Sequence, residues 1–509
     1  MKHFHFGLCF LSLLSTVLGY GQQSDSLAIK VKEKQDVIRH FEEPIYVNPS
    51  HYLDYRKYSL TSFEIAKQNS KNETTLAQEG KNRDDLSFQA EAYHKLDKHS
   101  AVWGSATYQQ GKRRDVMWNE SADYDLIFPY VVADSVGGDI KYEDYHIEGG
   151  YAQRLGKYNI GISGFYKAKM EYRNIDPRPK NLSARLGGNI GVSRVFKELF
   201  TIGVNTSIEK YTQKHKMDFY SPTGFPVIYE MSGMGNFNNL LKGKRREAYY
   251  DGWRYGTSLQ VYDTSQKKWF ATVGMNIFSF EKLLPDFYDL QVSKIKEVEH
   301  FLSIGKLFDV QATQLGVRLD GNMKTRKGTE NLFVNVSVTN YLKIGQEEQY
   351  KYENKSLRLS GVFKYETLNS VYSILPYIGI SQEVERYKKP YTKTDIQYTY
   401  IGADLQWMYT FKDRSLLTVT SNWKVRQTAK EKAAFNYGNS NAINQMLLDN
   451  YAVQIAEYWE GSFKVRYDFA LPKVIDVFVG GEYYFQNYKQ FQNNSSVMMS
   501  LGITFRFAN

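Results

Sequence analysis

Cysteine is almost absent from this chain of 509 residues, in which the single cysteine is Cys9. Cys9 lies in an apolar run at residues 6–19, which follows Lys2 and precedes polar residues at 22 and 23. Such a run is typical of a secretory signal peptide, and it is too short for a spanning helix, which needs about 20 residues. We therefore expect residues 1–21 to be cleaved, which leaves a mature chain without cysteine or disulfide bonds.

Long apolar runs are also missing, because no later segment has 18 consecutive apolar residues and the mean hydropathy is −0.51. Helical membrane spans are therefore excluded. A transmembrane β-barrel remains compatible with this composition, since only every second residue of each strand faces lipid and no long apolar run is needed. Proline is scarce, at 11 residues, whereas aromatic residues make up 15% of the chain and include 41 tyrosines. Tyrosine suits the interfacial girdles of a barrel.

Neither sign of charge forms a tail or a helical stripe. The 65 basic residues are interleaved with 55 acidic ones, and the net charge is +10. An exported protein does not meet nucleic acid, and a nucleic-acid interface would concentrate its basic residues on one face. We therefore expect no nucleic-acid partner.

Apolar and polar residues alternate in segments from about residue 59 to the end. In one of these, Tyr145 and Ile147 share a face opposite His146 and Glu148. We predict an all-β, transmembrane antiparallel barrel of about 18 strands, within a range of 16 to 20. We read residues 283–310 as one long loop, although two short strands would also fit there. The predicted strands are 59–68, 85–96, 100–110, 145–155, 158–171, 182–195, 199–216, 248–263, 268–282, 311–323, 332–341, 356–366, 371–385, 395–411, 415–427, 451–469, 475–485 and 496–507.

The tight turns between these strands all fall at one end of the barrel. Bacterial barrels keep short turns in the periplasm, so we expect both termini there and the long connections outside. The chain then divides into a signal peptide (1–21), a periplasmic or lumen-inserted segment (22–58) and the barrel (59–509). We expect the function to lie in the long outer loops, which are 69–84, 111–144, 217–247, 283–310 and 428–450.

The C-terminus carries a pattern for barrel assembly. Gly502, Phe505 and Phe507 form Gly-x-x-Phe-x-Phe, which resembles the terminal-strand signature read by the barrel-insertion machinery. Three internal motifs accompany it, at residues 102–108, at 118–119 and at 172–181. With them, the chain resembles an outer-membrane β-barrel family of Bacteroidota that has no assigned function. The resemblance implies location and architecture and lends no activity.

A barrel of this size is wide enough for an aqueous channel. Basic side chains that alternation places inside would favour anions, as rings of Arg and Lys do in anion pores. The alternative is that acidic neighbours, such as Glu148, Asp320, Glu460, Asp468 and Glu482, pair with them in a filled lumen. The pore-lining candidates are Arg154, Arg318, Lys424, Arg426, Lys464, Arg466 and Arg506.

Two basic clusters fall in long outer loops, at residues 112–114 and 242–246. We consider Arg113, Arg114, Lys244, Arg245 and Arg246 as ligands for lipopolysaccharide phosphates or another acidic ligand. The alternative is that they are solvated loop charges.

No catalytic or metal motif is present. The chain lacks Gly-x-Ser-x-Gly, the phosphate-binding Gly-x-x-x-x-Gly-Lys-Ser/Thr loop and His-Glu-x-x-His, and its histidines are scattered. We therefore expect no catalytic site, metal or cofactor. We predict a porin-like or accessory transport channel, for which a preference for anions is one option. The alternative is a non-conducting scaffold whose outer loops bind a lipoprotein, a transporter or a surface ligand.

Overall fold

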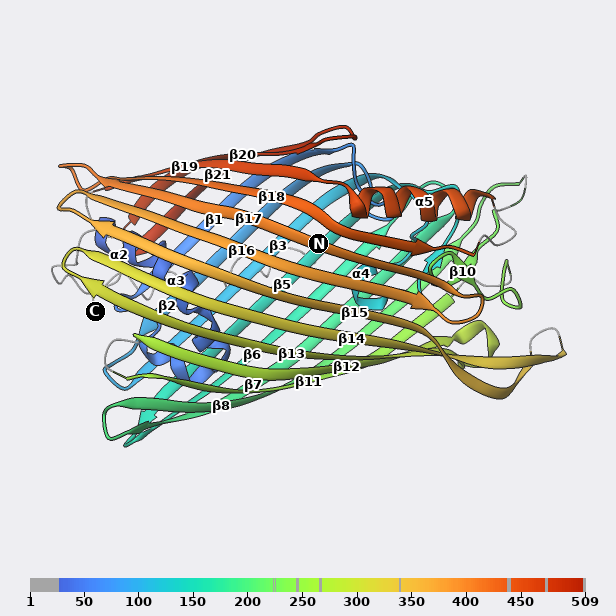
Figure 1. Ribbon diagram of the computed structural model, residues 1–509, viewed down its shortest axis with the longest axis horizontal. Coiled ribbons are helices and arrows are strands. Elements are labelled where there is room, and N and C mark those ends of the chain that lie inside the picture. The colour runs from blue at the N-terminus through green and yellow to red at the C-terminus, as the bar shows by residue number, and fades with distance from the viewer. Residues whose placement is uncertain are drawn as a thin grey trace, which may run out of the picture.

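The computed structural model describes residues 27–222, 224, 226–243, 247–264, 268–337, 340–436, 441–471 and 475–506. Eighteen strands form one antiparallel sheet. The sheet closes into a barrel, because β1 (Leu60–Asn72) pairs with both β2 (Asn82–Lys95) and the last strand, β21 (Asn494–Arg506) (Figure 1). The predicted fold class is confirmed.

Each barrel strand pairs with the barrel strands before and after it in the chain, which gives a simple up-and-down barrel. The remaining strands are β3 (Ser100–Val116), β5 (Gly138–Leu155), β6 (Tyr158–Tyr172), β7 (Arg178–Phe196), β8 (Phe200–Asp218), β11 (Glu247–Asp263), β12 (Trp269–Leu284), β13 (Leu290–Val310), β14 (Thr313–Ser337), β15 (Asn340–Glu366), β16 (Ser370–Tyr387), β17 (Thr392–Thr410), β18 (Leu416–Ala434), β19 (Tyr458–Phe469) and β20 (Ile475–Tyr488).

The two ends of the barrel differ. Short turns join strand pairs such as β5–β6 and β7–β8 at one end, which we call the turn end, and β1 begins there beside the end of β21. At the opposite end, which we call the loop end, long connections join β3 to β5, β8 to β11 and β18 to β19. The chain therefore enters and leaves the barrel wall at the turn end, as the parity of the predicted turns requires.

The strands turn apolar side chains outward and polar ones inward. In β7, Leu186 and Ile190 are 61% and 54% exposed on the outer face, whereas Ser183 and Ser193 are buried on the inner face. The pleat gives this alternation a period of two residues. The outer face therefore forms the apolar belt that a bilayer requires.

The segment 283–310 corrects the sequence interpretation, because it is a short connection followed by the full-length strand β13. The predicted strands 311–323 and 332–341 are not separate, since the first covers the turn at 311–312 and the start of β14, and the second spans the end of β14 and the start of β15. One strand was missed and one was counted twice, so the predicted total agrees. In β13, Lys294 and Lys296 face outward near the loop end while Ile295 is buried inside, and this inversion hides the amphipathic pattern.

The terminal strand follows the predicted alternation. Leu501 is exposed on the outer face and Gly502 is buried on the inner one. The ring of Phe505 lies edge-on to that of Phe63 in β1, with centroids 5.8 Å apart. Phe507 and the side chain of Arg506 lie outside the described residues.

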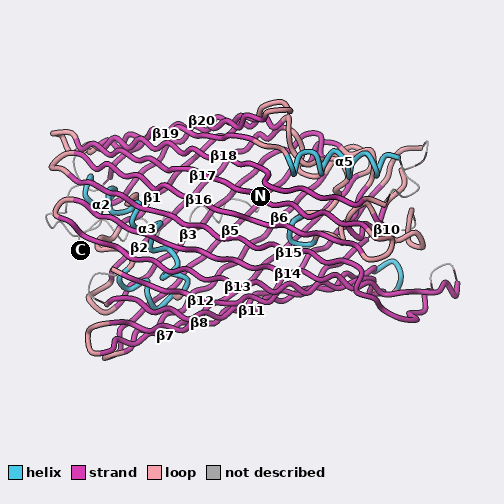
Figure 2. The backbone as a smooth tube through the Cα atoms, in the orientation of Figure 1, coloured by secondary structure: helices cyan, strands magenta, loops and turns pink. Residues whose placement is uncertain are grey.

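The helices gather toward the two ends of the barrel (Figure 2). Near the turn end lie α2 (Leu27–Lys34), α3 (Val37–Glu42) and the 3-10 helices η1 (Glu43–Val47) and η2 (Pro49–Asp54). The other elements are α4 (Tyr124–Ile127), α5 (Asn441–Ile455), η3 (Pro285–Phe287) and a small sheet of β4 (Val132–Ala133), β9 (Tyr229–Gly233) and β10 (Asn236–Phe237). No helix within the described residues is long and apolar enough to cross a membrane.

Candidate functional site: a lumen closed at two levels

Residues 27–58 fill the turn end of the lumen, and we call them the plug (Figure 1). Local signals fix their compact fold. The Asp36 side chain caps α3 by accepting from the backbone N–H of Ile38, and Asn48 caps η2 by accepting from that of Ser50. Pro44 is the second residue of η1 and Pro49 is the first of η2, both in the first turn, where a missing N–H costs no helical hydrogen bond.

Ion pairs tie the plug to the barrel wall on several sides. Asp36 pairs with Lys364 of β15 at 2.7 Å, and Asp54 pairs with Arg154 of β5 at 2.9 Å. Lys34 lies 2.9 Å from Glu91 of β2. Burial lowers the pKa of Lys34, and Glu91 opposes this shift.

Hydrogen bonds to plug carbonyls complete this ring of anchors. Arg318 of β14 donates to the carbonyls of His40 and Phe41 at 2.8 and 2.9 Å. Asn189 of β7 donates to that of Val47 at 2.9 Å, and Thr272 of β12 to that of Pro44 at 3.0 Å. Because the anchors come from strands all around the barrel, the plug is held as one body.

Three glycines of the wall make room for the plug. A Cβ at Gly161 of β6 would collide with the backbone of Pro49, and one at Gly191 of β7 with the Asn48 side chain. A Cβ at Gly203 of β8 would meet His51. Close approach of another backbone is a main reason for glycine inside a strand. Sequence analysis missed these residues, although glycines in three successive strands were a usable signal.

Aromatic contacts pack one side of the plug against the wall strands β2 and β3. The rings of Tyr52 and Trp103 stack with centroids 4.2 Å apart, and the Tyr93 hydroxyl donates to the Tyr52 carbonyl at 2.7 Å. Trp103 belongs to the motif at 102–108, so this motif now has a structural role.

A second closure, which we call the cap, fills the loop end. It consists of residues 117–137, residues 226–243 and α5, and it contains the sheet of β4, β9 and β10. Trp118, Tyr130, Met231 and Ile443 are buried in its apolar core, which continues into Phe278, Phe280 and Ile295 of the wall. An apolar core inside the lumen explains why wall residues are apolar on their inner face here.

A buried charge cluster holds the cap to the wall. The guanidinium of Arg173, just after β6, pairs with Glu120 and, at 3.3 Å, with Asp134. Asn181 of β7 donates to the Glu120 carbonyl at 2.8 Å. Burial raises the pKa of Glu120 well above its ordinary value, and the neighbouring Asp134 adds to the shift. These residues come from the motif at 172–181 and the segment after 118–119, which the fold brings together.

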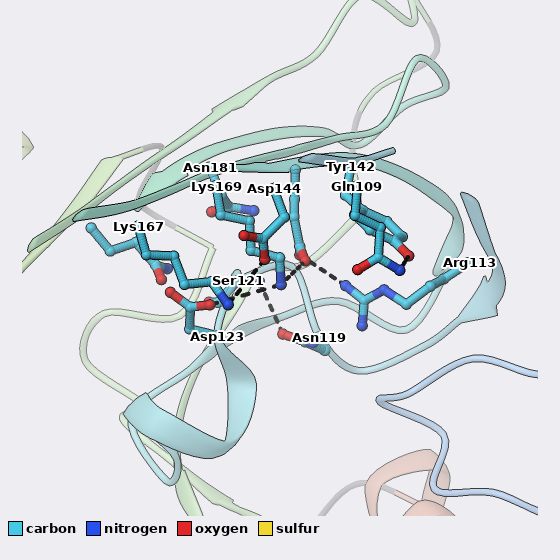
Figure 3. A network of polar contacts seen from close by, with 12 residues as sticks. Gln109, Arg113, Asn119, Ser121, Asp123, Tyr142, Asp144, Lys167, Lys169 and Asn181 are labelled. Carbon is cyan, nitrogen blue, oxygen red and sulfur yellow. Dashed lines mark hydrogen bonds and ion pairs between the residues drawn. The ribbon is translucent and has the colours of Figure 1, made fainter. Parts of the chain in front are cut away.

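Figure 3 shows a second set of anchors beside this cluster. Glu171 accepts from Arg113 at 2.8 Å and pairs with Lys169 at 2.5 Å. Lys169 also reaches Asp123 of the cap at 3.7 Å, and Lys167 pairs with Asp144 at 3.1 Å (Figure 3). Arg113 therefore lies in strand β3 and faces the lumen, which corrects its predicted position in an outer loop.

A cavity of about 680 Å³ lies in the lumen against the plug, and a second of about 1130 Å³ lies between the plug and the wall at the turn end. The wall of the first cavity contains Arg318, Arg358, Lys464 and Arg466 together with Glu64, Glu91, Asp404 and Glu482. A smaller cavity of about 340 Å³ lies beneath the cap. The lumen thus offers polar space between the two closures, and the charges of both signs on its wall are nearly balanced.

Six of the seven predicted pore-lining cations have a partner, and the side chain of the seventh, Arg506, lies outside the described residues. Lys424 pairs with Glu460 at 3.0 Å, and Lys464 with Glu482 at 3.8 Å. Arg466 binds both oxygens of Asp468, and Arg426 donates to the carbonyls of Gln454 and Ala456 at the end of α5. Arg154 and Arg318 hold the plug, as described above. The acidic-neighbour alternative describes Lys424, Lys464, Arg466 and also Arg318, which pairs with Asp320 at 2.8 Å, whereas Arg154 and Arg426 have other partners.

The remaining loop-binding candidates fall into two groups, one that the structure describes and one that it does not. Arg114 is exposed near the loop end of β3. Lys244, Arg245 and Arg246 lie outside the described residues, as does the predicted signal peptide. The described part of the chain contains no group of three His, Cys, Asp or Glu side chains that would hold a metal ion.

Comparisons with known proteins give one family and several solved structures. The ferric preacinetobactin receptor BauA from Acinetobacter baumannii is 9% identical, with 88% of this chain and 81% of that chain covered and a TM-score of 0.39. The FrpB iron transporter from Neisseria meningitidis is also 9% identical, with 88% and 81% covered and a TM-score of 0.43. OccK5 (OpdH) of Pseudomonas aeruginosa is 9% identical, with 89% and 99% covered and a TM-score of 0.32.

No curated protein sequence matches the chain. A family of unknown function, DUF6850, matches residues 49–507, which include η2 and all eighteen barrel strands. Because this match spans most of the sequence, the chain belongs to the DUF6850 family.

Proposed function

We propose that this protein is a transport barrel of the outer membrane whose pathway is closed at rest by the plug and the cap. The observation that carries the proposal is the pair of separate closures on either side of polar lumen space, with a cavity of about 680 Å³ against the plug. A barrel that served only as a wall for outer loops would need neither an internal plug nor polar space behind it. Transport then requires both closures to move.

The membrane placement rests on the apolar outer belt and the closed sheet, which leaves no unpaired edge in lipid. The turn end faces the periplasm and the loop end faces outward, as in other bacterial barrels. Export would use the cleaved signal peptide, and assembly would use the terminal signal at Gly502, Phe505 and Phe507. Outer-membrane lipid and lipopolysaccharide then surround the barrel, and Arg114 lies at the level of the lipopolysaccharide phosphates.

The solute in this proposal carries a polar or charged group, because the space between the closures is polar. The predicted pore-lining cations whose side chains are described are matched by carboxylates and carbonyls, so an opened pathway has only a weak preference for anions. An anion preference would appear if opening separated Arg318 or Arg154 from the plug, because those two cations would then face the pathway alone.

Planar-bilayer recordings test this function. The wild-type barrel should show little conductance, whereas a variant without residues 27–58 and with Arg173→Ala should conduct steadily. A heat-dependent gel shift serves as the folding control for both proteins. If the folded double variant leaves the bilayer sealed, transport through the lumen is refuted.

The cap favours a second function, a non-conducting scaffold. Its extended apolar core makes the loop end a stable outer surface on which a lipoprotein, a transporter or a surface ligand would dock. Copurification of a stoichiometric partner with a sealed barrel would support this function over transport.

A further inference from the structure

The wall of the barrel has a weak seam between β15 and β16. Their strand pairing runs without interruption to Ser360 and Tyr377 and resumes at Phe363 and Ile374. The pairs that would join Gly361 to Pro376 and Val362 to Leu375 are absent. Proline has no N–H to donate to the ladder, and it is therefore normally confined to edge strands.

The seam lies at the middle of the apolar belt. On β16 the outward residues run from Tyr372 through Ile374 and Ile378 to Ile380, and all four are exposed. This stretch is about 27 Å long at about 3.4 Å per residue, and tilt reduces it to about 20 Å of height. Pro376 is its midpoint, where no water can replace a lost ladder hydrogen bond.

An apolar groove opens on the outer face at this seam. Its volume is about 660 Å³, and its outer wall is made by Leu359, Ile378, Ile401, Trp423 and Val425. Gly361 allows close approach of the Pro376 ring at the floor of the groove, because a Cβ there would lie 3.3 Å from Cγ of Pro376. Gly361 also lines the charged cavity of about 680 Å³ on the inner side. Groove and cavity therefore meet at the same backbone.

The inner side of the seam offers a cation. Arg358 lines the cavity, donates from Nε to Ser360 Oγ at 3.1 Å and lies over the Tyr377 ring at 3.9 Å. Within the described residues no carboxylate forms an ion pair with Arg358, in contrast to Lys424, Lys464 and Arg466. Asp404 on the same cavity wall interacts electrostatically with Arg358 without forming an ion pair, so an anionic group in the cavity can bind the guanidinium.

We propose that the seam is a lateral site for a single-chain anionic amphipath, such as a fatty acid. The carboxylate binds Arg358 from the lumen, and the acyl chain enters the groove when the two strands part between Gly361 and Pro376, where no pairing joins them. Charge inside and apolar surface outside, at one break in the wall, match the two parts of such a molecule. This inference rests on the proposed transport function and names its substrate class.

Photo-crosslinking tests the site with two fatty-acid probes in nanodiscs that contain the full barrel. A probe with its diazirine beside the carboxylate should label Arg358 or Ser360, and one with its diazirine at the chain end should label Ile378 or Trp423. A bilayer lipid that merely fills the groove would keep its head at the membrane surface, so exclusively outer labelling by the carboxylate-side probe overturns the proposal.

Two variants sharpen the test. Pro376→Val restores the ladder donor and Gly361→Leu fills the groove, so each should lower lumen labelling by about fivefold or more. Pro179→Val is the matched control, because Pro179 lies at the loop end of β7, where the strand pairing is intact. Equal labelling in all variants refutes the seam. A barrel that labels as expected but never conducts would refute only the proposed pathway along the lumen.

Discussion

Removal of the Arg318 side chain should release the plug. Its guanidinium donates to two plug carbonyls, at 2.8 and 2.9 Å, and the side chain is only 17% exposed. Hydrogen bonds to a charged group contribute about 1.5–3 kcal/mol each, and water entering the vacated space recovers part of this. We therefore expect Arg318→Ala to weaken docking of the plug by about 2–4 kcal/mol, which corresponds to a population of released plug about 30 to 1,000 times larger.

Cysteine labelling measures this release cleanly, since the mature chain is expected to have no cysteine of its own. Ala28 is 2% exposed in the docked plug, so Ala28→Cys should react with a maleimide only when the plug leaves the wall. Arg318→Ala should speed this labelling by the same factor. Lys424→Ala is the control, because Lys424 is paired with Glu460 of the wall and should leave the rate unchanged. An unaltered rate in Arg318→Ala, or equal acceleration by both variants, would refute the anchoring argument.

Three further predictions concern the cap, the wall and the terminus. Burial and Asp134 raise the pKa of Glu120 above the ordinary 4.5, so the closed cap binds a proton more tightly than the open one. Cap closure should be strongest below pH 4.5 and weaken as pH rises through the raised pKa, and proteolysis of the cap should lose this pH dependence in Glu120→Gln. Gly191→Ala should loosen the plug in the labelling assay, whereas Gly188→Ala, whose Cβ would find its nearest neighbour at 3.6 Å, should not. Deletion of residues 505–509 should block assembly, as judged by the heat-dependent gel shift; normal insertion would remove the terminal signal from the argument.

The barrel itself was predictable because lipid imposes one rule on every strand. Outward residues such as Leu186 and Ile190 must be apolar wherever the wall meets the bilayer, so period-two alternation marks the strands. The alternation of apolar and polar residues is lost where the inner face of a strand packs against protein and not against water. At Ile295 the inner face packs on the cap core while Lys294 and Lys296 point outward beyond the belt, and the strand was therefore read as a loop.

Alternation also identifies which side chains face inward without showing what they meet there. Arg154 and Arg318 were assigned to the lumen wall from their spacing, yet their partners are Asp54 and two carbonyls of the plug. Those contacts join residues separated by 100 positions or more in the chain. No local pattern encodes such a separation, so the closure of the lumen became visible only in three dimensions.

The internal motifs take their meaning from these distant contacts. Trp103 stacks on the plug, Trp118 is buried in the cap, and Arg173 clamps two carboxylates of the cap. An open pore would not require such residues, since it has no plug or cap inside its lumen to hold in place. In this barrel the distinctive residues instead hold the two closures in place. The function is therefore best sought in what releases the plug and the cap, and the charged anchors are the first side chains to change.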